Sequence, residues 1–402
     1  MRVPATFLGN ARNDIIFNMK NPFAYNPYNR FSFINHLAET DDPFSDRKKI
    51  RADILSRFRD GRSNVVLYGP RGYGTSSLAI ELEADLRKAD VRCVTLDVAK
   101  LPSIDLFVSS YVTKVFHRLK PDQFEFSQIE TFLKSLKPKK IANWMGEERL
   151  FYNSTDAPIS FEALTEVLDL PQKLLPEEDR AVVIFDEFQE VKDLLPNDMF
   201  ERTMRSVIQS HSNVSYLFLG SHYHVLQMFT DPNRPLYKSA AASLLDKPPV
   251  DESIRFVVDR FARARMTIDR KDAEHLVAKA RNTPCFLQQL ASETFRLVND
   301  EHRKNVSNVD VNVAFSNVSR SNRNLYEQLM LTLSGSQKKL LIALAHERTS
   351  DFGGAYRWWH LLGASSSVSS AKAKLMENGL VEFSDGHYMI FDPFFERFLF
   401  MA

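Results

Sequence analysis

The chain has 402 residues, of which 44% are hydrophobic and 26% charged, and its formal net charge is +1. This composition is that of an ordinary globular core and excludes a disordered, collagen-like or repeat protein. Because Lys plus Arg nearly balances Asp plus Glu, the overall charge supplies no field that attracts DNA, RNA or an anionic membrane, and such a partner would need a local patch.

Residues 1–42 are rich in Asn, Pro and aromatic side chains, which favours an irregular arm. No stretch there has the apolar run of a signal peptide, and no run elsewhere approaches the ~18 apolar residues of a membrane span. Cys93 and Cys285 are the two cysteines, and their spacing suggests neither a disulfide framework nor a metal site. These features predict a soluble cytoplasmic protein without a membrane partner.

Between residues 43 and 245, apolar runs alternate with helix-periodic segments, which is typical of a parallel α/β sheet. Residues 102–170 carry helical patterns and are predicted as an insertion between strands. Residues 246–320 predict a helical lid, and 321–402 predict helices followed by a hairpin, the order of a winged helix. The predicted strands of the sheet are 64–68, 91–96, 181–185 and 214–219. We expect the last of these strands to complete the sheet.

A glycine-rich turn follows the first predicted strand and precedes a helix, which is the position of a phosphate-binding loop. The usual pattern is G-x-x-x-x-G-K-[ST]. Gly69, Gly74 and Ser76 match it, whereas Thr75 stands where the lysine would be. Taken alone, a plain strand-to-helix turn explains the glycines about equally well. The residues of the candidate loop are Gly69, Pro70, Arg71, Gly72, Tyr73, Gly74, Thr75, Ser76 and Ser77.

The third predicted strand ends in paired carboxylates, Asp186 and Glu187, the pattern of a Walker B motif. In such a motif Asp186 holds a magnesium ion, and Glu187 orients and deprotonates the attacking water. The alternative is a strand that ends in a solvated acidic turn, which is less favoured downstream of a phosphate loop. Ser221, after the fourth strand, stands where a sensor hydroxyl would contact the γ-phosphate, although a lone serine there is more often a helix cap.

Taken together, these motifs resemble the archaeal-type ATPases of the STAND branch of AAA-like P-loop proteins, over residues 43 to 399. Pro43–Ile50 is similar to the family's PF-x-x-R-x-x-E-I box, with Ile50 in place of the acid. Asn282–Gln289 is similar to its G-x-P-x-x-x-Q helix start, with Asn282 in place of the glycine. The other matching segments are Asn64–Ser77, Phe185–Phe188, Gly220-Ser221, Met228-Phe229, Pro235–Tyr237 and Tyr388–Leu399.

The resemblance implies a P-loop NTPase sheet of the AAA/STAND type, followed by a helical lid and a winged helix, that binds ATP or ADP with Mg²⁺. Carried over by position, Pro43 and Phe44 would flank the adenine, and Pro284 would close it from the lid. The loop 69–77 would hold phosphates, and Ser76 and Asp186 would hold magnesium. Thr75 removes the cation that stabilises charge at the β/γ bridge, so hydrolysis is expected to be weak.

Two functions remain open. The first is an ATPase or nucleotide switch with weak hydrolysis, and the second is a hydrolytically dead scaffold that binds DNA or a protein partner through its winged helix. The predicted recognition helix, about 367–378, carries Lys372 and Lys374, and 321–402 contains eight basic and eight acidic residues. We therefore expect DNA binding to be weak and the module to serve as a lid. The oligomeric state, monomer or homo-oligomer, is left open.

Two further residue sets carry weaker expectations. Arg234 is preferred over Arg202 and Arg205 as an arginine finger that reaches a neighbour's nucleotide, although salt bridging is the commoner role of such residues. Trp358 and Trp359 are predicted to pack in the winged-helix core.

Overall fold

The computed structural model describes residues 21–23, 47–59, 63–119, 133, 139–142, 148–152 and 158–401. The chain divides into two compact units. We call Arg47–Asp246 the sheet unit, and Lys247–Ala402 with Met1–Asp46 the helical unit. Most of the N-terminal arm, with Pro43 and Phe44, lies outside the described residues.

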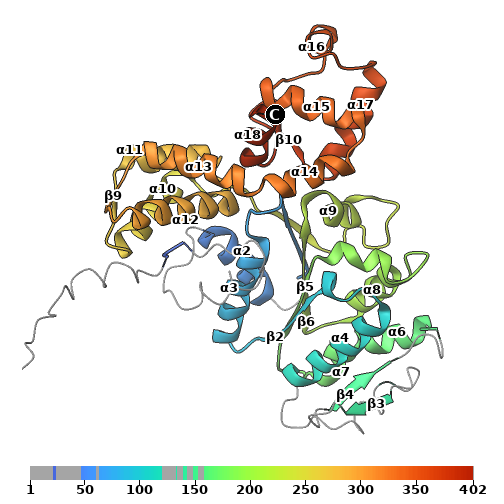
Figure 1. The fold of residues 1–402 in the computed structure, drawn as a ribbon. Coiled ribbons are helices and arrows are strands. Elements are labelled where there is room, and N and C mark those ends of the chain that lie inside the picture. The colour runs from blue at the N-terminus through green and yellow to red at the C-terminus, as the bar shows by residue number, and fades with distance from the viewer. Residues whose placement is uncertain are drawn as a thin grey trace, which may run out of the picture. The chain divides into compact units, whose positions relative to one another are not determined.

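A five-stranded parallel sheet forms the centre of the sheet unit (Figure 1). Its three central strands are rich in Val, Leu and Phe and are buried on both faces, as expected where helices cover both sides. The strands are β1 (Val65–Gly69), β2 (Arg92–Asp97), β5 (Ala181–Asp186), β6 (Val214–Ser221) and β7 (Ala241–Leu244). Their order across the sheet is β2-β5-β6-β1-β7.

Helices cover both faces of this sheet (Figure 1). On one face, strand residues such as Phe185 and Tyr216 pack against α4, and the ring of Phe185 stacks on that of Tyr111 with centroids 6.0 Å apart. The helices are α2 (Lys48–Arg59), α3 (Thr75–Lys88), α4 (Ile104–Leu119), α6 (Phe161–Leu168), α7 (Leu170–Leu174), α8 (Met199–Ser210) and α9 (His222–Thr230), with 3₁₀ turns η1 (Val98–Lys100) and η3 (Phe188–Asp193).

The sheet contains one strand more than the sequence predicts. The edge strand β7 has the sequence Ala-Ala-Ser-Leu and alternates half-buried with exposed residues, so it lacks the apolar run of the other four strands. The segment 102–170 also differs from a purely helical insertion. It contains an antiparallel pair, β3 (Lys139–Ala142) and β4 (Glu148–Phe151).

The helical unit contains two groups of helices. Local signals start several of them. Asp269 caps the helix that begins at Arg270, and Ser307 and Ser334 form capping boxes at the helices that begin at Asn308 and Gly335. The first group is α10 (Val250–Arg263), α11 (Arg270–Lys279), α12 (Pro284–Asp300) and α13 (Asn308–Ser321), with a short strand pair β8 (Thr267–Ile268) and β9 (Asn305–Val306).

The second group has the helix and hairpin order of a winged helix. In its hairpin, Asp385 and Gly386 both have positive φ (52° and 78°), as a two-residue type I′ turn requires. The elements are α14 (Arg323–Thr332), α15 (Gly335–His346), α16 (Gly354–Trp359), α17 (Ser365–Glu377), β10 (Val381–Ser384), β11 (His387–Ile390) and α18 (Pro393–Met401).

The prediction that Trp358 and Trp359 pack in the winged-helix core is wrong. Their exposed fractions are 77% and 71%, and α16 buries none of its six residues. Side chains of α15, α17, β11 and α18 fill that core instead, including Leu341 and Phe394. Within the described residues, no helix is both long enough and apolar enough to cross a membrane.

Candidate functional site

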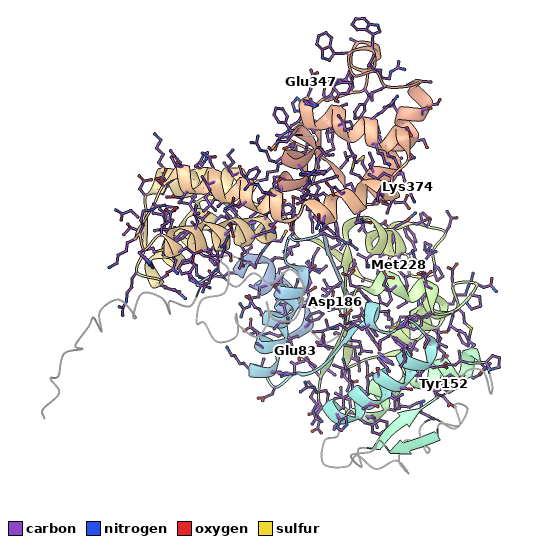
Figure 2. The ribbon with its side chains drawn as sticks, in the orientation of Figure 1. Glu83, Tyr152, Asp186, Met228, Glu347 and Lys374 are labelled. Carbon is purple, nitrogen blue, oxygen red and sulfur yellow. The ribbon has the colours of Figure 1, made fainter. Side chains whose placement is uncertain are left out.

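The candidate site lies at the carboxyl edge of the sheet, where four neighbouring strands end. Gly69 of β1 is in register with Ser221 of β6, and Asp97 of β2 is in register with Asp186 of β5. Figure 2 labels Asp186 at the end of its strand. The side chains of 221–224 are outside the described part, so Ser221 is placed by its backbone alone. In open parallel sheets, this edge is where ligands bind.

The loop from Gly69 to α3 turns back on itself through two glycines with positive φ. Gly72 has φ 80° and Gly74 has φ 94°, a conformation that a residue with a Cβ rarely adopts. The N–H of Tyr73 donates to the carbonyl of Pro70 at 3.2 Å, which closes the turn. Helix α3 begins at Thr75. The N–H groups of its first turn have no partner within the helix and form an anion-binding position.

Arg47 fixes the back of this loop. Its Nη2 donates to the carbonyl of Tyr73 at 2.7 Å, and its Nη1 donates to the carbonyl of Asp246. Burial lowers the pKa of the Arg47 guanidinium, which is the largest effect on that group. Arg47 belongs to the 43–50 segment that the sequence singled out, but its role depends on contacts with residues far along the chain, which the sequence pattern does not contain.

The loop that contains Ser76 and the strand that ends in Asp186 meet at this edge of the sheet, and Ser76 is near enough to lower the pKa of the Asp186 carboxyl. The N–H of Glu187 donates to Asp186 Oδ1 at 3.0 Å. Burial raises the pKa of Asp186, and the nearby negative charges of Glu187 and Asp97 raise it further, against the lowering effect of the neighbouring Ser76 hydroxyl.

Asp97 is a site residue that sequence reasoning missed. Its Oδ1 is buried without a hydrogen-bond partner in the described structure, while Oδ2 pairs with Lys100 at 3.3 Å. Its signal in the sequence was an acidic residue directly after an apolar run, as at Asp186. Three carboxylates therefore interact at one edge of the sheet. This excess of negative charge and the spare buried oxygen fit a divalent cation.

No cluster of three or more His, Cys, Asp or Glu side chains with metal-binding geometry occurs among the described residues. Mg²⁺ is commonly held by one or two protein ligands together with water and substrate phosphates. Ser76 and Asp186 supply a hydroxyl and a carboxylate oxygen, both of which are hard ligands. The residues present therefore fit a nucleotide-bound magnesium ion.

Glu187 is held by a neighbour that the sequence analysis also missed. Its φ is 51°, in the left-handed region, so the chain turns sharply after β5. Gln189 Nε2 donates to Glu187 Oε2 at 2.6 Å, and the Gln189 side chain is buried. The carboxylate that would orient water is thus oriented by an amide two residues later.

The other predicted residues are distributed as follows. Thr75 is the first residue of α3. Pro284 is the first residue of α12 in the helical unit and is buried. Asn282 has φ 52°, which explains how it replaces the family's glycine, because Asn enters the left-handed region more readily than most residues. Arg234 is ion-paired with Asp198 at 3.3 Å and with Glu201, so its guanidinium is engaged within the sheet unit.

Comparisons with known proteins agree with this geometry. The family described as "Probable winged helix domain" matches residues 324–401. A Walker-type ATPase of Pyrococcus abyssi is similar in structure at 17% identity, over 88% of this chain and 95% of that chain, with a TM-score of 0.61. The ORC2 protein of Aeropyrum pernix, in ADPNP and ADP complexes, is similar at 15% identity, over 88% of this chain and 90% of that chain, with a TM-score of 0.55.

A search of curated protein sequences finds no match to this chain. At 15–17% identity, the structural similarities establish the fold and leave the activity to the chemistry of the site. The predicted fold class is confirmed, and so is the resemblance on which it rested. The chain has the P-loop α/β fold of a Walker-type ATPase, joined to a C-terminal winged helix domain.

Proposed function

We propose that the chain binds ATP or ADP with Mg²⁺ at the 69–77 loop and acts as an ATPase or nucleotide switch with weak hydrolysis. The observation that carries the proposal is that the 69–77 loop, after β1, and Asp186, at the end of β5, lie at the same edge of the parallel sheet. A phosphate loop and a Walker B carboxylate at one sheet edge are the arrangement that holds magnesium in P-loop NTPases. The solved complexes of the ORC2 protein hold adenine nucleotides on a similar fold, which is consistent with this ligand class.

Each residue then has a defined role. The N–H groups of the loop and of the first turn of α3 bind the phosphates. Ser76 and Asp186 hold magnesium, which supplies positive charge to the phosphate oxygens. Glu187 orients the attacking water and accepts its proton, and Ser221 acts as the sensor hydroxyl. Pro43 and Phe44 flank the adenine, and Pro284 covers it from the 246–320 lid.

Thr75 is the reason for weak hydrolysis. In the transition state, charge accumulates on oxygens at the β/γ bridge, where the usual lysine places a cation. Threonine keeps a hydroxyl but carries no charge. The contact between Gln189 and Glu187 works in the same direction, because the carboxylate that would accept the proton is already hydrogen-bonded. Binding depends less on this cation, since the backbone N–H groups and the magnesium ligands remain.

A second function is a hydrolytically dead scaffold. Thr75, the contact between Gln189 and Glu187, and the winged helix match favour it. It would bind nucleotide for structure and a protein or DNA through residues 324–401. The two functions differ in turnover, because only the ATPase or switch hydrolyses ATP. In both, the cellular compartment expected is the cytoplasm, and the chain can be monomeric or homo-oligomeric.

Isothermal titration calorimetry is expected to show binding of ATP and ADP in the presence of Mg²⁺. Ser76→Ala should abolish the dependence of affinity on magnesium, because the hydroxyl ligand is lost. Glu187→Gln should leave affinity unchanged, because the base does not hold nucleotide, and it serves as the matched control. A folded protein that releases no heat with millimolar nucleotide would contradict the proposal.

DNA binding is expected to be weak and to fall steeply as salt increases. Both lysines of the recognition helix α17 are already engaged. Lys372 Nζ donates to the Tyr388 hydroxyl at 3.3 Å and lies 4.8 Å from its ring centroid, and Lys374 pairs with Glu377 at 2.9 Å. Fluorescence anisotropy with a labelled duplex measures this. Nanomolar affinity at physiological salt would favour the scaffold function instead.

A further inference from the structure

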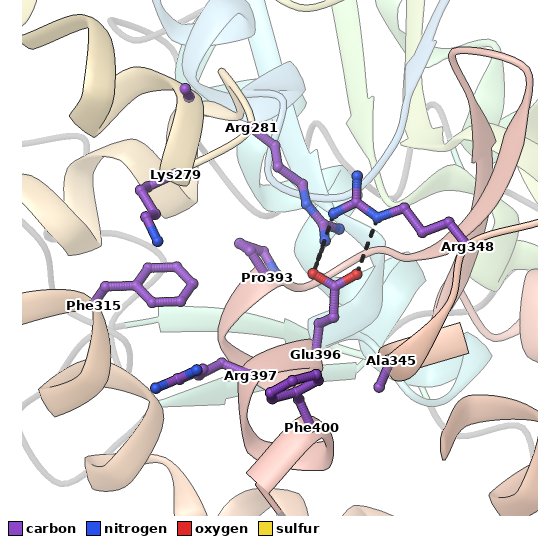
Figure 3. A pocket seen from close by; sticks show the side chains of 10 residues that line it. Lys279, Arg281, Phe315, Ala345, Arg348, Pro393, Glu396, Arg397 and Phe400 are labelled. Carbon is purple, nitrogen blue, oxygen red and sulfur yellow. Dashed lines mark hydrogen bonds and ion pairs between the residues drawn. The ribbon is translucent and has the colours of Figure 1, made fainter. Parts of the chain in front are cut away.

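A charged pocket lies within the helical unit, and none of its lining residues belongs to the phosphate loop. It has a volume of about 400 Å³ and lies among α11, α13, α15 and α18 (Figure 3). We call it the α18 pocket, after the helix that supplies four of its ten lining residues. Its charged lining residues are Lys279, Arg281, Arg348, Glu396 and Arg397. Four cations and one anion give the lining an excess of positive charge.

Two of the cations are neutralised in part by the one acid. The Arg281 guanidinium donates to the Glu396 carboxylate and to the carbonyl of Ile390, and Arg348 donates to the same carboxylate at 3.3 Å (Figure 3). Glu382 also attracts Arg281 and Arg348, although it does not line the pocket. These contacts make Arg281, Arg348 and Glu396 a fixed wall whose geometry is set without a ligand.

Lys279 and Arg397 have no such acid. Within the described residues, neither forms an ion pair, and the Lys279 ammonium lies 5.1 Å from the ring centroid of Phe315. In Figure 3 both side chains point away from Glu396, on the side of the pocket where Phe315 lies. Two cations at one concave surface repel each other, so an anion that contacts both is stabilised.

The remaining lining determines what the anion can be attached to. Phe315, Pro393 and Phe400 provide apolar wall beside the cations. A pocket of this size exceeds a lone phosphate, and its mixture of cations and aromatic rings suits a phosphate that carries an apolar or planar group. We propose that the α18 pocket binds the phosphate group of a phosphorylated compound, through Lys279 and Arg397, independently of the nucleotide at the 69–77 loop.

The test separates this pocket from the phosphate loop. Gly74→Asp places a carboxylate in the loop at φ 94°, where a residue with a Cβ is strained, and with EDTA present the added charge and the strain should remove phosphate binding there. Calorimetric titration of the full chain carrying Gly74→Asp with pyrophosphate is expected to show one remaining site. Adding Lys279→Gln and Arg397→Gln should weaken that site about tenfold or more.

Matched controls keep the result specific. Lys304→Gln with Arg265→Gln removes the same charge from exposed positions of the same unit outside the pocket, and pyrophosphate affinity should be unchanged. Lys279→Arg with Arg397→Lys keeps the charge and should retain most of the binding, and circular dichroism verifies that every variant is folded. No pyrophosphate binding by the Gly74→Asp chain, or equal loss in the pocket pair and the exposed pair, overturns the proposal.

A second arm identifies the source of the phosphate. If it belongs to a nucleic acid backbone, Lys279→Gln with Arg397→Gln should lower the slope of log affinity against log salt for a duplex by about 2. If it belongs to a free phosphorylated compound, that slope should equal the slope of the exposed-pair control. Either outcome supports the phosphate assignment when the pyrophosphate site is lost.

Discussion

Thr75→Lys is expected to raise the kcat of ATP hydrolysis about 30-fold or more, which corresponds to about 2 kcal/mol or more of barrier. The physical reason is electrostatic. Ser76 lies in the first turn of α3, and Asp186 and Glu187 lie at the end of β5 at the same edge of the sheet, so the missing element is one cation at the β/γ oxygens. A lysine at the start of α3 carries that charge on a flexible stem. Steady-state phosphate release, measured with saturating ATP and Mg²⁺, tests this expectation.

Two variants control for changes in shape. Thr75→Gln lengthens the side chain without adding charge and should leave kcat near that of the parent. Glu187→Gln in the Thr75→Lys background removes the base and should abolish the gain while nucleotide still binds. Unchanged phosphate release by Thr75→Lys, with binding intact, would favour the dead scaffold. Ordinary ATPase turnover by the parent would show that another cation, such as the exposed Arg71, replaces the lysine.

Arg234→Gln is expected to destabilise the protein by about 3–5 kcal/mol at pH 8, the cost of leaving a buried charge without its partner. The Glu201 side chain is 1% exposed and its Oε2 has no hydrogen-bond partner within the described structure, so Arg234 supplies the compensating charge. Urea unfolding followed by circular dichroism at pH 8 and pH 5.5 measures the cost. Lys88→Gln at an exposed position of α3 removes the same charge away from Glu201, and as the control it should cost less than about 0.5 kcal/mol.

The free energy of unfolding that Glu201 contributes decreases as pH rises. Burial raises the pKa of Glu201 from 4.5 to about 7 in the folded protein, against the attraction of Arg234. The folded state therefore binds this proton more tightly than the unfolded state, and the wild type loses stability as pH rises from about 4.5 to about 7. Without Arg234 the pKa rises further, so the loss continues above pH 7 and the variant's cost is smaller at pH 5.5. An equal cost at both pH values would contradict this assignment. Loss of ATPase activity without loss of stability would restore Arg234 as an arginine finger.

Much of the sheet could be predicted from the sequence because burial on both faces requires uninterrupted apolar runs. Four strands were found in this way, and only their ends shifted. For example, 181–185 extends to Asp186 and 214–219 extends to Ser221. The edge strand β7 could not be found, because its Ala-Ala-Ser-Leu sequence is half exposed and has the composition of a loop. Its position is fixed by pairing with β1, a contact between distant segments.

In the winged helix, the hairpin could be predicted from the sequence, but the burial of one helix could not. Its hairpin follows from local signals, since an Asp-Gly turn between two apolar runs is a strong hairpin pattern. The expectation for Trp358 and Trp359 rested on the rule that large apolar side chains are usually buried. Helix α16 is an exception to that rule, because its six residues all remain at least partly exposed. Burial depends on what the rest of the chain packs against a helix, which composition alone does not supply.

In the candidate site, the order of the motifs predicted which strand ends carry the site residues. It did not predict which neighbouring side chains orient those residues. Asp97 was missed although it pairs in register with Asp186. Arg47 and Gln189 were missed because each acts by a hydrogen bond to another residue of the site. Arg and Gln are common on protein surfaces, so neither residue type indicates a site by itself. Their roles can be assigned only when the contacts between distant segments are known.

The central claim is that nucleotide binds at the 69–77 loop with magnesium at Ser76 and Asp186. A crystal of the full chain grown with ADP and Mn²⁺ in place of Mg²⁺ tests it most directly, because the anomalous signal of manganese locates the metal independently of the nucleotide. The expected result is phosphate density against the loop N–H groups and an anomalous peak beside the Ser76 hydroxyl and the Asp186 carboxylate. Nucleotide bound elsewhere on the chain, or a loop 69–77 empty at saturating ADP and Mn²⁺, would contradict the claim.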